Sequence, residues 1–142
     1  MSISLDTART IVAAVRAARV DHELRPLTVA VLDAGGHVVA VEREDGSAIG
    51  RFDIAFGKAR GALSLGMGSR ALMARAEQQP YFIAAATAAL DGRLIPVPGG
   101  VLVCNDEGEL LGAVGVSGDT SDNDELAALI GIKAAGLVAE TG

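Results

Sequence analysis

LTVAVLDAGGHVVAVERED, residues 27 to 45, places two runs rich in β-branched residues on either side of a Gly-Gly pair. The runs predict a strand over 27–34 and a return strand over 37–45, because Gly35-Gly36 supplies the backbone freedom that a tight turn needs. Turns of hairpin length imply antiparallel pairing, since parallel neighbours require a crossover of a dozen residues or more. This stretch therefore predicts an antiparallel sheet at the centre of the fold.

A long helix is predicted directly after the hairpin. Apolar residues recur at helical spacing from about Ile49 to Leu65 and form one face. Gly57 and Gly61 lie four residues apart on this helix and leave a shallow groove. Close packing of another segment and close approach of a flat ligand both explain that groove.

The remaining elements alternate with turns marked by glycine, proline and aspartate. Their order is helix, two strands, two or three helices, three strands and helix. This order predicts an α+β fold, with a five-stranded antiparallel sheet flanked by helices in a single domain over residues 1–142. The other predicted helices run from Ser4 or Asp6 to about Ala18, from a cap at Ser69 to residue 79, over 80–90 and over 125–140, and the other predicted strands cover 93–97, 101–105 and 109–116.

Composition narrows the classes of partner. The net charge of −6 argues against nucleic acid, which needs a basic surface to displace counterions. No run of 18 apolar residues occurs, so neither a membrane span nor a signal peptide is expected. The single cysteine, Cys104, cannot form an internal disulfide and lies in an apolar run. We therefore expect a cytoplasmic protein with a buried thiol and no membrane or nucleic-acid partner.

The acid-rich stretch GAVGVSGDTSDNDE, residues 112 to 125, tests the metal hypotheses. A calcium loop starting at Asp119 would have Asp124 in place of the required glycine and Ile130 in place of the bidentate glutamate. Zinc would need three or four suitably spaced ligands, and the chain offers only His22, His37 and one distant cysteine. No metal site is predicted.

Helix capping explains much of the same stretch. Ser121 with Asp124 three residues later has the shape of a capping box, and acids are favourable in a first helical turn. Capping does not explain Gly115 and Gly118, which leave an open backbone beside Ser117. Residues 115–118 therefore form a candidate wall of a small-ligand pocket.

A basic cluster is predicted where the second strand gives way to the long helix. Arg51 and Lys58 are seven residues apart and share a face of that helix. Cations that converge at this junction would bind a carboxylate or propionate. Surface ion pairs with Glu42, Glu44 and Asp53 explain the same residues equally well. The cluster consists of Arg43, Asp45, Arg51 and Lys58.

Four motifs together resemble the GlcG/HbpS family, whose domain also forms the C-terminal part of PduO-type corrinoid adenosyltransferases. They are VAVLDAGGHVVAVEREDGS (29–47), IAFGKA (54–59), PVPGGVLV (96–103) and LLGAVGVSGDTSDNDE (110–125). The resemblance implies a profilin-like α/β/α domain that assembles as a homodimer or larger homo-oligomer. Some members of the family bind haem.

The resemblance also transfers candidate site residues. His22, in the connection from the first helix to the first strand, is the candidate axial ligand of a noncovalent haem. Glu44 departs from the family pattern, which often has methionine there, and makes that wall less apolar. The matching positions are Arg43, Asp45, Lys58, Gly99, Gly100, Ser117, Gly118, Asp124 and Glu125.

Three functional hypotheses follow. The first is a small-ligand-binding protein of GlcG/HbpS type, with haem as a candidate ligand, associated with a catabolic or redox-stress pathway. The second is a small-molecule lyase, hydratase or isomerase in which Lys58 or Asp124 transfers a proton. The third is an accessory oligomeric protein with no chemistry of its own.

Overall fold

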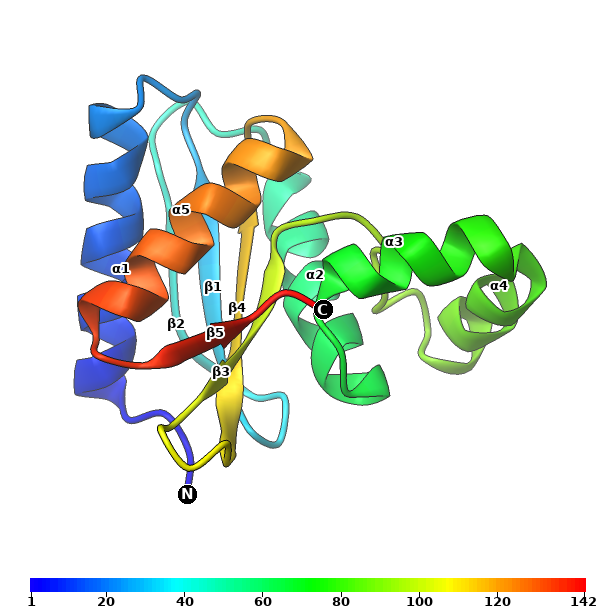
Figure 1. Cartoon of the computed structure of the whole chain (residues 1–142). Coiled ribbons are helices and arrows are strands. Elements are labelled where there is room, and N and C mark those ends of the chain that lie inside the picture. The colour runs from blue at the N-terminus through cyan, green and yellow to red at the C-terminus, as the bar shows by residue number, and fades with distance from the viewer.

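The computed structural model describes residues 1–142 and shows three layers (Figure 1). The helices are α1 (Leu5–Asp21), α2 (Arg51–Leu65), α3 (Ser69–Gln78), α4 (Pro80–Ala89) and α5 (Ser121–Ala134). The strands are β1 (Thr28–Asp33), β2 (Val38–Arg43), β3 (Gly100–Cys104), β4 (Leu110–Ser117) and β5 (Val138–Glu140). The sheet is the middle layer, α1 and α5 cover one face, α2 covers the other, and α3 and α4 project sideways as an arm (Figure 1).

The five strands form one antiparallel sheet in the order β2-β1-β4-β3-β5. The predicted hairpin is its β1–β2 edge. Thr28, at the start of β1, lies opposite Arg43 at the end of β2 and opposite Ser117 at the end of β4. The loops that adjoin these three residues therefore meet at one end of the sheet.

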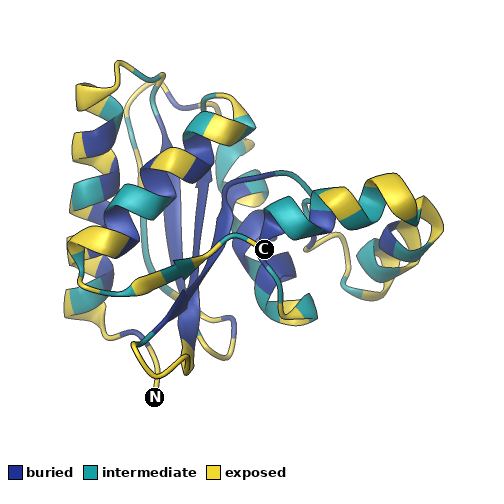
Figure 2. Cartoon of the chain, in the orientation of Figure 1, coloured by how far each residue is buried: buried dark blue, intermediate teal, exposed yellow.

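The main core lies between the sheet and the helices α1 and α5. It consists largely of valine, isoleucine and alanine, as the low aromatic content requires. A smaller cluster lies between the sheet and α2, and a third lies within the α3–α4 arm. Figure 2 shows buried residues along the strands and exposed residues on the outer sides of the helices. Cys104 is buried, and burial raises the pKa of its thiol.

The strand predicted over 93–97 is wrong, because this segment packs on α2 instead of joining the sheet. The Ile95 N–H donates to the Gly57 carbonyl oxygen at 3.2 Å. A Cβ on Gly57 would lie 2.6 Å from Ile95 Cγ1, and one on Gly61 would lie 3.0 Å from Leu94 Cα. The groove over the two glycines is therefore filled by the chain itself, which confirms close packing as its explanation.

The fifth strand comes from the C-terminus. The predicted helix over 125–140 is wrong in its last part, because α5 ends at Ala134 and Gly136 adopts a φ of +73°. That left-handed residue redirects the chain so that β5 can pair with β3.

One predicted helix cap is confirmed and two are wrong. Ser4, one of the two alternatives predicted for α1, caps this helix, and its hydroxyl accepts a hydrogen bond from the Thr7 N–H. Ser69 does not cap α3, because its hydroxyl exchanges hydrogen bonds with the backbone of Gly100. Thr120, and not the predicted Ser121, caps α5.

None of the five helices is long and apolar enough to cross a membrane.

Candidate functional site

Three loops converge at the end of the sheet where β1 begins and β2 and β4 end. Two carboxylates fasten them together: Glu44 Oε1 accepts the Leu27 N–H at 2.8 Å, and Asp119 Oδ2 accepts the Arg25 N–H at 2.8 Å. The Arg25 hydrogen bond is the main cause that lowers the pKa of Asp119. A Cβ on Gly118, whose φ is +155°, would clash with the carbonyl oxygen of Pro26, in the loop before β1. These loops therefore hold one another at short range.

A cavity of about 170 Å³ lies between the loops. Arg51, the first residue of α2, donates from Nη1 to Ser117 Oγ at 3.1 Å. The Arg25 side chain donates no hydrogen bond, and neither arginine forms an ion pair with a carboxylate. The lining residues are Arg25, Pro26, Gly46, Ser47, Ala48, Arg51 and Gly118.

The side chains of Arg25 and Arg51 both line this small cavity, and their chemistry suits an anion. Guanidinium groups bind carboxylate and phosphate oxygens through paired hydrogen bonds. The Ser47 hydroxyl is already engaged with Thr28 Oγ1 at 2.8 Å, so it contributes little to a ligand. Arg25 and Arg51 are therefore the charged groups that this cavity offers to a ligand.

Lys58 and Asp124 form a buried ion pair beneath this end of the sheet. Lys58 Nζ donates to Asp124 Oδ2 at 3.0 Å and to the Val116 carbonyl oxygen at 2.9 Å. Asp124 Oδ1 accepts the Asp119 N–H at 2.9 Å. The two side chains are 2% and 1% exposed, and neither lines a cavity. Desolvation lowers the pKa of Lys58, and Asp124 opposes that effect.

The glycine pair at the start of β3 makes room for this lysine. Gly99 has a φ of +124°, and a Cβ there would lie 2.8 Å from Lys58 Nζ. A Cβ on Gly100 would meet the Lys58 carbonyl group. Gly99 thus lies against the ammonium group of the ion pair and Gly100 against the backbone of Lys58, and neither glycine lines the cavity.

The other predicted residues have structural partners or lie on the surface. Arg43 Nη1 donates to the Ser47 carbonyl oxygen at 3.0 Å and so braces the cavity loop from outside. Glu125 accepts from Arg70 of α3 at 3.0 Å. Asp45 is exposed in the loop, and His22 is exposed at the C-terminal cap of α1.

The predicted alternative, in which Glu42, Glu44 and Asp53 pair with the basic cluster, is wrong. Glu42 and Glu44 pair with Arg16 of α1, and Glu44 also lies 3.7 Å from Arg19. No acid in the β2–α2 region pairs with Arg43 or Arg51.

The structure therefore divides the predicted residues into two groups. Arg51 and Gly118 line the cavity, and the buried Ser117 accepts a hydrogen bond from Arg51. Lys58 and Asp124 meet in the interior. Sequence reasoning missed Arg25 and the cavity-facing part of residues 46–48. An Arg-Pro pair immediately before a predicted strand was the only available signal for Arg25.

Comparison with known proteins finds one matching family and several similar solved structures. A family model described as "Haem degrading protein HbpS-like" matches residues 3–133. The chain is similar to the crystal structure of the Klebsiella pneumoniae protein ORFY, with 29% identity, a TM-score of 0.85 and coverage of 94% of this chain and 90% of that one. No protein of curated function matches the chain.

Two further solved structures are similar. A variant of Streptomyces reticuli HbpS has 29% identity and a TM-score of 0.77, over 94% of this chain and 86% of that one. A PduOC:heme complex has 22% identity and a TM-score of 0.86, over 97% and 98% of the two chains. At that identity the second likeness supports the fold alone.

Proposed function

The chain belongs to the HbpS-like family, and from this premise we propose that it binds a small anionic ligand without covalent attachment, with haem as the first candidate. The family description names haem degradation, which supports haem as the first ligand to test. A role in a catabolic or redox-stress pathway is part of this proposal.

The observation that carries the proposal is the cavity between Arg25 and Arg51. Neither guanidinium group forms an ion pair with a carboxylate, although the chain has 18 acidic residues and 12 basic ones, and Arg25 has only a longer-range charge interaction with Asp119. Arg51 is also oriented by its hydrogen bond to Ser117. A ligand carboxylate would satisfy both cations and would exploit positions that the fold already fixes.

The residues fit the propionates of haem better than its macrocycle. The cavities of the chain measure about 170 to 200 Å³, below the roughly 300–1,000 Å³ of sites that enclose a drug-sized ligand. Arg25 and Arg51 would hold a propionate, and His22, in the same connection as Arg25, is the candidate axial ligand. Haem, when bound, supplies an iron centre for redox or sensing chemistry.

A second copy of the chain would supply the surface that this cavity lacks. In a homodimer, the macrocycle would lie between the cavity of one protomer and its partner. The proposed assembly is therefore linked to the proposed ligand, and haem is expected to shift the protein toward the dimer in light scattering.

Hemin titration followed by the Soret band tests the proposal. We expect a saturable shift for the wild type, a loss of about tenfold in affinity for Arg51→Gln or Arg25→Gln, and an altered band for His22→Ala. Arg9→Gln is the matched control, because Arg9 is exposed, has no partner and lies about 20 Å along α1 from His22.

The outcomes separate the parts of the proposal. A wild type without any Soret shift would remove haem as the ligand. A shift that is equal in the wild type and in the Arg25 and Arg51 variants would remove the cavity from the site.

The alternative proton-transfer function gains no support from the position of its residues. Lys58 or Asp124 would have to reach a substrate, and each is enclosed by the other and by backbone groups. Their arrangement supports a structural role, in which a buried pair fixes α2 against the start of α5.

A further inference from the structure

A groove runs over the outer side of α2, away from the cavity described above. Two cavities of about 200 and 190 Å³ share Arg60 and Ser64 as lining residues. The end of α4 and the loop after it close the first through Ala89, Leu90, Asp91 and Arg93, and residues 34–36, in the hairpin turn, close the second. Arg60 lies about 14 Å along α2 from Arg51, so the groove is a separate place on the molecule.

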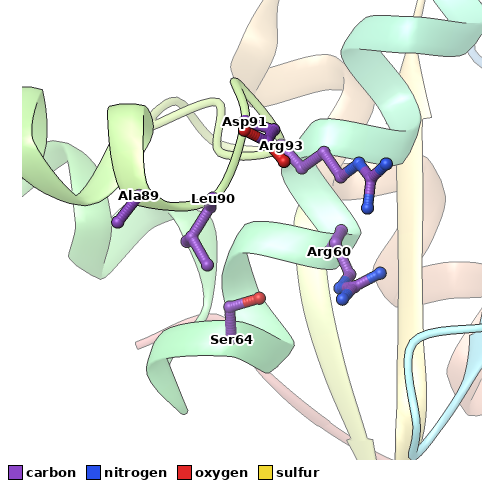
Figure 3. Close-up of a pocket in the computed structure, with 6 residues that line it drawn as sticks. All are labelled: Arg60, Ser64, Ala89, Leu90, Asp91 and Arg93. Carbon is purple, nitrogen blue, oxygen red and sulfur yellow. The ribbon is translucent and has the colours of Figure 1, made fainter.

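Two arginines face the first cavity. Figure 3 shows the side chains of Arg60 and Arg93 extending toward the same side of the pocket. Neither guanidinium group donates a hydrogen bond within the chain, and neither forms an ion pair. Two positive charges at one cavity repel each other, and an anion bound between them would offset that repulsion.

The position of Arg60 is set by the hairpin turn. A Cβ on Gly36, whose φ is +82°, would lie 2.9 Å from Arg60 Nε, so the arginine stem packs directly on that turn. Arg60 is only half-exposed, whereas Arg93 is exposed on its loop. Arg60 is therefore held against the turn, whereas Arg93 projects from an exposed loop.

Asp91 also lines the first cavity and opposes an anion there. Its carboxylate lies beyond ion-pair distance from both arginines, so it does not neutralise either one. The groove keeps a net positive charge on a chain whose net charge is −6. Leu90 and Leu63 supply an apolar contact at each cavity.

We propose that this groove is a second ligand site, which binds the carboxylate or phosphate group of a small molecule between Arg60 and Arg93. Arg60 is the anchor because the turn orients it, and Ser64 offers a hydroxyl donor beside it. The apolar side chains contact the short carbon part of the ligand. Paired guanidinium groups are suited to both oxyanions.

Titration with inorganic phosphate and, separately, with succinate tests the site. The readout is the NMR signal of each arginine Nε–H, which assigns binding to Arg60 and Arg93 and separates it from Arg51. We expect saturable shifts at Arg60 and Arg93 with at least one of the two probes, and the stronger probe identifies the oxyanion. Arg93→Gln should weaken that binding by about tenfold.

Asp91→Asn gives the opposite expectation and is the sharper test. Asp91 has a φ of +54°, a conformation that asparagine adopts as readily as aspartate, so the substitution removes charge and leaves the backbone unstrained. Binding should tighten by about threefold to tenfold once this repulsion is removed. Arg9→Gln, on an exposed face of α1, should leave the affinity unchanged.

Shifts that fail to saturate with both probes would overturn the site. Equal affinities in the wild type, Arg93→Gln and Asp91→Asn would overturn it as well. Because Arg93 and Asp91 are both exposed, these variants report on binding even if Arg60→Gln disturbs packing at the turn.

Discussion

Asp124→Asn should strongly destabilise the protein through the ammonium group that it leaves behind. The amide can still accept the Asp119 N–H, but it has no negative charge to offer Lys58. Lys58 would keep a single acceptor, the Val116 carbonyl oxygen at 2.9 Å. A cation in the interior would then be half satisfied.

The size of the effect follows from the burial of the pair. Removing one partner of an ion pair whose side chains are 2% and 1% exposed costs about 3–5 kcal/mol of unfolding free energy. Folded domains have about 5–15 kcal/mol in total, so the change is a large fraction. For a chain of 142 residues it corresponds to a melting temperature lower by roughly 10 °C.

The loss should depend on pH in a defined direction. Burial already lowers the pKa of Lys58, and Asp124 is the influence that raises it, so the pKa falls further in the variant. Between that lower pKa and the ordinary lysine value, the unfolded chain binds more protons than the folded protein. Stability therefore rises with pH in this window, and the deficit shrinks from about pH 7 toward about pH 9.5.

Urea unfolding followed by circular dichroism at both pH values measures the deficit. Asp122→Asn is the matched control on the same helical turn, because Asp122 is 79% exposed and should cost under about 1 kcal/mol. A loss of less than about 1 kcal/mol for Asp124→Asn, or a deficit that grows with pH, would refute the reasoning.

Two further changes test the loops and the glycines of this region. Gly100→Ala should cost about 1–3 kcal/mol of unfolding free energy, because its methyl group would meet the Lys58 carbonyl group, whereas Gly50→Ala, with open space around it, should cost almost nothing in the same urea titration. Asp119→Asn should cost about 1–2 kcal/mol at neutral pH through its hydrogen bond from Arg25. The pKa of Asp119 is lowered in the folded protein, so its contribution is present above the ordinary aspartate value and is lost as pH falls below it. Parallel acid titrations of the wild type and the variant should therefore converge below about pH 4, and curves that stay apart would contradict this assignment.

Local signals predicted the antiparallel sheet because hairpins and their turns are encoded within a few residues. The Gly35-Gly36 turn is an example. The segment 93–97 misled because it is apolar and of strand length, yet prolines at 96 and 98 remove ladder donors, and the α2 glycines offer it a place to pack. Strand β5 was missed because three residues after a helical pattern carry too little signal.

The site was predictable only where one sequence segment carries it. The stretch around Ser117 and the start of α2 are such segments, and Arg51 and Gly118 do line the cavity. Arg25 reaches it from a connection more than twenty residues upstream of Arg51, and no local pattern links the two. Lys58 and Asp124 were predicted as functional because their chemistry is visible in the sequence while their burial is not.

The fold itself keeps Arg25 and Arg51 out of ion pairs, because the carboxylates near them bind other groups. In a chain with more acids than bases, an arginine lacks a partner only if nearby carboxylates are engaged elsewhere or held out of reach. At the loop cavity, Asp119 accepts backbone and amide donors, and Glu44 accepts Leu27 and faces α1. These carboxylates fix the loops, and they form no ion pair with Arg25 or Arg51, as the proposed anion site requires. The hydrogen bonds that hold the loops together therefore also leave the cavity with a positive charge.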